Sequence, residues 1–316
     1  MFGFWGSLAQ GERLAIGFRA STAPEPDRRP VPRGYHLENT STIHGAPGTR
    51  TLGSMKKRPT VKDWLPLART ERGAAELPTG AAFRPEWIDF EKGIRVGNLE
   101  PHERITRILK YGLEQGYGTG FVTDRWGRGV FWQWICWLPR ANRDAKPVSG
   151  GTNFGCAKLY ITIDRTHRIF QCGLAVERGF ISGRPSIPGI LLKPDWDWHR
   201  LMKQCTAGSD LDREMFRLVR REGFCATVTG ASGTSTFDLK TFRSARQIRE
   251  TARKAKPGAW AGFDLFYPMP ESEVRATSGY DLVQGIMGAF AEVIPAMNLC
   301  MQVPLSSAMD RRLPKE

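Results

Sequence analysis

Arginines recur along one short segment at a spacing that would bring their charges together. Arg243, Arg246, Arg249 and Arg253 are separated by three, three and four residues, which places them on one face of an α-helix. Residues 240–256 hold seven Lys and Arg side chains against a single acid. Because like charges this close destabilise a free helix, the pattern favours a bound polyanion.

Further cations fall where turns between strands are expected. Arg125 and Arg128 lie in a predicted tight turn over 124–128, and Arg165 and Arg168 flank a second turn. Three more cations lie in a polar loop predicted over residues 139–153: Arg140, Arg143 and Lys146. Turns at the end of a sheet can reach a phosphate backbone. A single arginine is explained as well by an ordinary solvated surface, so only the collective pattern favours a nucleic-acid partner.

An acid and a lysine two positions apart offer a second chemistry. At the end of a strand predicted over 235–239, Asp238 and Lys240 would project to the same side. Metal-dependent nucleases use such a pair to hold a divalent ion and to orient water, so this alternative requires Mg²⁺. The neighbouring predicted strand, 224–229, supplies no acid as a second ligand. Asp238 and Lys240 are the catalytic candidates, and the sequence indicates no cofactor otherwise.

The sequence contains no motif for a nucleotide-binding loop, a nucleophile elbow or a zinc site, because the residues that resemble such motifs have the wrong spacing or lie between the wrong elements. The glycine-rich stretch 149–156 lacks the lysine of a phosphate-binding loop, and 116–120 follows a predicted helix where a dinucleotide loop needs a strand. Residues 230–233 lie between two predicted strands, whereas a nucleophile elbow joins a strand to a helix. The five histidines have no paired spacing, so no local zinc motif is present.

The composition is that of a globular, strongly basic protein. Of its 316 residues, 41% are hydrophobic, and the formal net charge is +14, which attracts polyanions. Six cysteines, at least 16 residues apart, predict buried free thiols in a reducing, cytoplasmic setting. Neither a signal peptide nor an apolar run of about 18 residues is evident, so we expect no membrane association.

The elements that must position these residues lie in one predicted domain, residues 97–303. Residues 1–54 are rich in Pro, Arg, Ser and Gly and are expected to be disordered. A poorly defined lead-in covers 55–96, and Met55 is an alternative translation start. A frayed tail is predicted over 304–316.

Hairpins grouped between helices indicate an α+β fold, with an antiparallel or mixed sheet and helices on one or both faces. The sequence predicts helices over residues 101–115, 195–205, 210–222, 241–255 and 281–293, the last ending before Pro295. It predicts hairpins over 117–138, 159–176 and 224–239, and a final strand over 260–267.

Aromatic residues gather beside the first predicted turn. Alternation along a strand sends Trp132 and Trp134 to one face and Phe131 and Trp137 to the other, which leaves Trp126 as the exposed candidate for base stacking.

Together these features predict a nucleic-acid-binding protein that contacts the phosphate backbone through a basic helix and basic turns. The alternatives are an enzyme, such as the metal-dependent nuclease, and a protein-interaction module with a basic docking face.

Overall fold

The computed structural model describes residues 80–146, 155–178, 196–230, 233–255 and 259–306. Every described residue belongs to one compact unit, residues 59–316. The predicted disorder of residues 1–54 therefore lies outside the described residues, as do the choice between Met1 and Met55 and most of the predicted tail.

The described residues form a nine-stranded antiparallel sheet. The order is β1-β2-β4-β5-β6-β9-β7-β8, and β3 also pairs with β4. The strands are β1 (Ile88–Asp89), β2 (Gly93–Arg95), β3 (Phe121–Arg128), β4 (Phe131–Pro139), β5 (Lys158–Asp164), β6 (Ile169–Arg178), β7 (Cys225–Gly230), β8 (Gly233–Phe237) and β9 (Ala261–Pro270). The sheet thus begins before residue 97, where the sequence suggested that the domain starts.

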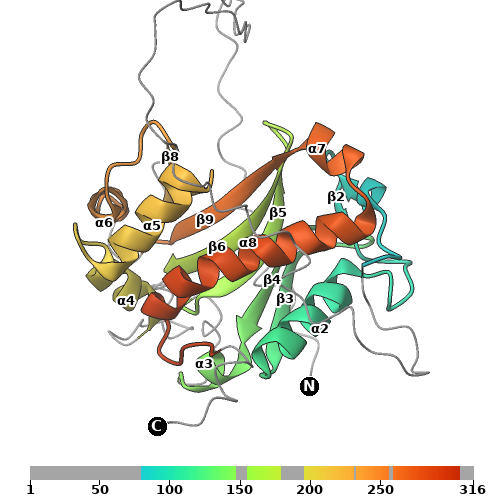
Figure 1. Ribbon diagram of the computed structural model, residues 1–316, viewed down its shortest axis with the longest axis horizontal. Coiled ribbons are helices and arrows are strands. Elements are labelled where there is room, and N and C mark those ends of the chain that lie inside the picture. Colours follow the sequence, from blue (N-terminus) through green and yellow to red (C-terminus); the bar gives the residue numbers. More distant parts are fainter. Residues whose placement is uncertain (1–79, 147–154, 179–195, 231–232, 256–258, 307–316) are drawn as a thin grey trace, which may run out of the picture. The chain divides into compact units, whose positions relative to one another are not determined.

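Helices pack on this sheet, which confirms the predicted α+β class (Figure 1). They are the 3-10 turn η3 (Pro85–Trp87), α2 (Ile105–Tyr117), α3 (Arg140–Asp144), α4 (Asp197–Gln204), α5 (Asp210–Arg221), α6 (Ala245–Arg253), α7 (Glu271–Ala276) and α8 (Gly279–Cys300). Ser209 caps α5, because its side chain accepts a hydrogen bond from the Asp212 amide. The sequence missed the short helices α3 and α7.

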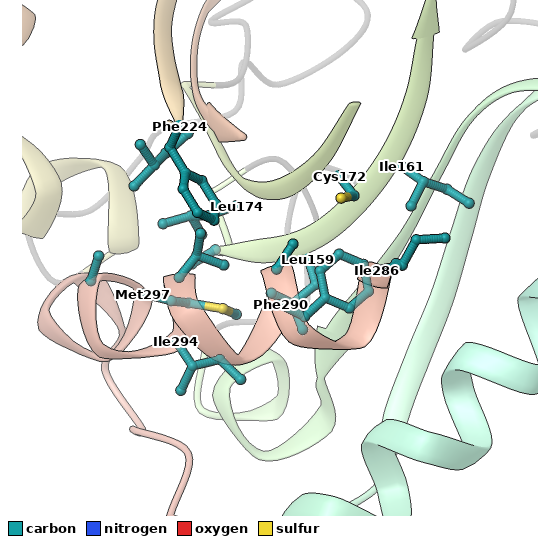
Figure 2. Packing of buried hydrophobic residues seen from close by; sticks show 14 of the residues in the cluster. Leu159, Ile161, Cys172, Leu174, Phe224, Ile286, Phe290, Ile294 and Met297 are labelled. Atoms are coloured by element: carbon teal, nitrogen blue, oxygen red, sulfur yellow. The ribbon is translucent and has the colours of Figure 1, made fainter. Parts of the chain in front are cut away.

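The core lies between α8 and the sheet face that we call the inner face. Alternate strand residues such as Leu159, Ile161 and Leu174 point toward α8, where they meet Ile286 and Phe290 (Figure 2). All five side chains are fully buried. Apolar residues therefore lie at every second position of the strands and along one face of α8, and together they form one buried layer.

The prediction that Pro295 ends the last helix is wrong. Helix α8 continues through Pro295 to Cys300. A proline inside a helix removes one backbone hydrogen bond. Here Ala296, Met297 and Cys300 are fully buried beyond it, so burial of the last turn offsets that missing bond.

By length and composition, α8 alone among the described helices could cross a membrane. Most of its apolar window is buried within the protein, against strands such as β6. A core helix has the same character, so this feature is weak evidence for a membrane span.

The predicted turn at residues 124–128 is also wrong, because these residues belong to β3. Gly127 suggested the turn, but it lies at an irregularity in the β3–β4 register, with φ of 145°. Its ideal Cβ would lie 2.7 Å from Trp132 Cα, so the close strands exclude a side chain there. The chain turns instead at Gly129 and Val130.

Lys146, predicted as a loop cation, is buried in a polar network. Its Nζ lies 3.0 Å from Asp197 Oδ1 and donates to the main-chain and side-chain oxygens of Asn142. Asn142 Nδ2 donates to Asp197 Oδ2, which also accepts from the Ala157 amide at 2.6 Å. The sequence misplaced Lys146 because α3 folds the start of the polar loop back onto the domain.

Replacing Lys146 by Met should leave Asp197 buried without its cation. We expect the free energy of unfolding to fall by about 3–5 kcal/mol, the range for breaking one side of a buried ion pair. Urea denaturation measures this decrease. Lys110→Met is the matched control, because Lys110 forms a partly exposed pair with Glu114 and its replacement should cost about 0.5 kcal/mol or less. Equal decreases in the two variants would contradict the assigned role of Lys146.

Candidate nucleic-acid interface

Helix α6 carries three of the four arginines that the sequence singled out: Arg246, Arg249 and Arg253. It runs from Ala245 to Arg253 and begins with a capping box between Ser244 and Gln247. Ala245, Ile248 and Ala252 are buried and form the apolar face of the helix. The helix is shorter than residues 241–255 because a separate turn occupies 238–241.

The four arginines of the predicted stripe are not equivalent. Arg246 forms an ion pair with Glu250 at 2.6 Å, which neutralises its charge. Arg243 precedes the helix and donates to the carbonyl oxygen of Lys240 at 2.6 Å. Arg249 is half-buried, whereas Arg253 is exposed. The stripe therefore presents fewer free charges than its spacing suggested.

The arginines expected at turns mostly bind the protein's own groups. Arg125 is in β3, and its guanidinium carbon lies 4.3 Å from the centroid of the Trp132 ring. Arg165 lies at its predicted turn and donates to Lys92 O at 3.0 Å and to the side chain of Gln133. The side chain of Arg128 lies outside the described residues.

Arg168 stabilises the turn between β5 and β6 through its backbone conformation and through its side chain. Its φ of 54° is left-handed, which lets the chain return into β6. Its side chain pairs with Glu271 and lies 3.8 Å from Glu91. The hydrogen bond to Glu271 raises the pKa of Arg168.

Trp126, expected to be exposed, is instead half-buried in β3 and opposes Trp134.

A second group of cations remains around the packed helices α5 and α6. The α6 amide of Ala245 donates to Asp212 of α5 at 2.6 Å, which fixes the two helices together. Seven cations of this region have no carboxylate oxygen within 4.0 Å among the described residues. We call them the α5–α6 basic surface: Arg220, Arg221, Lys240, Arg243, Arg249, Arg253 and Lys254.

Asp238 closes a turn at the end of β8 and does not extend that strand. β8 ends at Phe237, so the argument that Asp238 and Lys240 share one side of a strand does not hold. Asp238 Oδ1 accepts from the amides of Lys240 and Thr241, both at 2.9 Å, and from the Thr241 hydroxyl. These hydrogen bonds, led by that of the Thr241 side chain, lower the pKa of Asp238. No group of three metal-ligating side chains occurs among the described residues.

Sequence reasoning missed a polar cluster on the outer face of the sheet, opposite α8. Lys158 is buried and lies 2.5 Å from Glu177, whose other oxygen accepts from the Trp260 indole at 3.2 Å. The Lys158 ammonium also lies 5.5 Å from the Trp134 ring centroid. Burial opposes the charge of Lys158, but Glu177 raises the pKa of this lysine above its usual value.

Asp264 lies beside this pair, two strands from Lys158. In the antiparallel register Ala175 stands between Lys158 and Asp264, and Thr227 follows on β7. Burial, together with the charge of Glu177, raises the pKa of Asp264 to about 7. The buried hydroxyl of Tyr160 has no hydrogen-bond partner among the described residues. The sequence signal that could have revealed this polar cluster was the presence of polar residues at alternate positions of strands that are otherwise apolar.

The described cysteines confirm the predicted free thiols. All six are unpaired, and five of them are buried. Burial raises the pKa of Cys172 and of Cys136 above the usual thiol value. Such thiols are poor nucleophiles at neutral pH, so they fill the core and do not form a reactive site.

Comparison with protein-family models, with curated proteins and with solved structures gives no match to this chain. Any functional conclusion must therefore come from its own residues.

Asp264 should make the stability of the protein depend on pH. Its folded pKa is about 7 against a usual 3.8, so the folded state binds its proton more tightly and this contribution is complete below about pH 4. The contribution disappears as the pH rises toward 7. Urea unfolding between pH 4 and 8 should show the stability of wild type falling by a few kcal/mol relative to Asp264→Asn. Parallel pH profiles for the two proteins would contradict the raised pKa.

Proposed function

We propose that this protein binds nucleic acid through the phosphate backbone, and that the α5–α6 basic surface makes the contact. The observation that carries the proposal is the set of seven cations without a carboxylate partner among the described residues of that region. Other cations, such as Arg168 and Lys158, are matched by acids of the protein, whereas Arg125 and Arg165 contact an aromatic ring and neutral oxygen atoms. Unmatched cations repel one another, and phosphate groups relieve that repulsion.

The architecture supports this assignment. The buried face of α6 fixes the helix against β7, so its exposed side chains are held in place by a rigid element. Contacts of this kind position a nucleic acid and carry no sequence readout by themselves. We therefore expect binding to be strongly dependent on salt and weakly dependent on sequence.

A pair of exposed arginines tests the proposal. Arg243 and Arg253 lie on this surface, and their replacement by Gln removes charge. At Arg253, the last residue of α6, Gln also keeps helix propensity. The slope of log affinity against log salt on duplex DNA should flatten by about 1.8, because each phosphate that is no longer neutralised accounts for about 0.9. Fluorescence anisotropy titrations over a salt series measure this slope.

Arg213→Gln is the matched control, because Arg213 is an exposed residue of α5 that pairs with Asp210. Its replacement should leave the slope unchanged. Wild-type protein that binds no nucleic acid at low salt would overturn the proposal, as would a double variant that is folded and keeps the wild-type slope.

A further inference from the structure

Two large apolar side chains are exposed within the α5–α6 basic surface. Phe216 of α5 is 40% exposed, and Leu239, in the turn before α6, is 53% exposed. Among the described residues, Tyr280 is the one other large hydrophobic side chain with comparable exposure, and it lies at the start of α8. Single exposed apolar residues are common, but Phe216 and Leu239 both lie among cations that have no acidic partner in the described part of the chain.

The contacts of α5 fix where Phe216 lies. Asp212, Phe216 and Arg220 follow one another at intervals of four and so share one face of α5. Asp212 accepts from the amide of Ala245, and Arg220 donates to the carbonyl oxygen of Leu239. Phe216 therefore lies along the segment that leads into α6, between these two contacts.

Arg220 lies next to the exposed ring. Its guanidinium carbon is 5.9 Å from the Phe216 ring centroid. Arg220 has no acidic partner among the described residues, so its charge remains available beside the aromatic surface. Lys240 follows Leu239 in the turn, Arg243 lies between that turn and α6, and both are exposed. Arg220 thus lies beside the aromatic ring, and Lys240 and Arg243 lie on the segment that Arg220 contacts through Leu239.

This combination fits a ligand that alternates flat apolar groups with negative charges. A protein partner would need an interface of roughly 800 Å² on each side with an apolar centre, and two exposed side chains supply little of it. One ring is enough to stack one base. Duplex DNA keeps its bases stacked on one another, whereas a single strand leaves them free.

We infer that the α5–α6 basic surface binds single-stranded nucleic acid in preference to duplex, with a base stacked on Phe216 and adjacent phosphates on Arg220 and Arg243. This inference rests on the proposed function, because it names the class of nucleic acid that the same surface takes. The aromatic contact adds affinity for a single strand that electrostatic attraction to a duplex does not reproduce.

Anisotropy titrations with labelled oligo(dT) of about 20 nucleotides and a duplex of similar length separate the two contributions. Wild type should bind the single strand more tightly at equal salt. Phe216→Ala should weaken oligo(dT) binding at least about fivefold, leave duplex binding unchanged and keep the salt slope, since no charge is removed. Phe216→Trp should retain the preference, whereas Phe216→Leu should abolish it.

Tyr280→Ala is the control for removal of an exposed aromatic ring elsewhere and should change neither affinity. Urea denaturation of each variant confirms that it is folded. If wild type binds neither probe, the proposed function fails and the inference fails with it. If both probes bind equally, or if Phe216→Ala binds oligo(dT) like wild type, the inference alone is overturned. Competition by polyglutamate as effective as that by oligo(dT) would overturn it in favour of an acidic protein partner.

Discussion

The buried contact between Lys146 and Asp197 joins parts of the chain that are far apart in sequence. Asn142 of α3 bonds to both of these residues, and its side-chain oxygen also accepts from the amides of Gln302 and Val303 beyond α8. Asp197 begins α4 and accepts from Ala157, next to β5. A buried charge without its partners is costly, so the network holds α3, α4, β5 and the end of α8 in one arrangement.

Held in this way, the sheet has two chemically different faces. The inner face is apolar and is occupied by α8, whereas the outer face carries the Lys158–Glu177 pair, Asp264 and Tyr160. The α5–α6 basic surface lies near the end of the sheet formed by β7 and β8, where α6 packs on β7. The charge of the proposed site is thus carried by α5, α6 and the segment between β8 and α6, and the sheet supplies their rigid support.

Period and capping signals predicted much of this fold from the sequence. The hairpin over 159–176 and the helices over 210–222 and 241–255 each depend on residues close together in the chain, so local reasoning found them. The role of Gly127 depends on a facing strand, and the burial of Lys146 depends on Asp197, 51 residues away in the sequence. The spacing of Arg246 could show its place on a helix but not its pairing with Glu250. Phe216 was missed because its exposure follows from how α5 meets the turn before α6.

The position of α8 in the chain has a consequence for synthesis. This helix fills the core, yet it follows all nine strands in sequence order. Until Ile286, Phe290 and Met297 have left the ribosome, the part of the inner face that α8 covers is exposed in a nascent sheet. Exposed apolar strands of this kind are prone to association with other chains. The protein's yield in a cell should therefore depend on chaperones that shield the sheet until its last helix arrives.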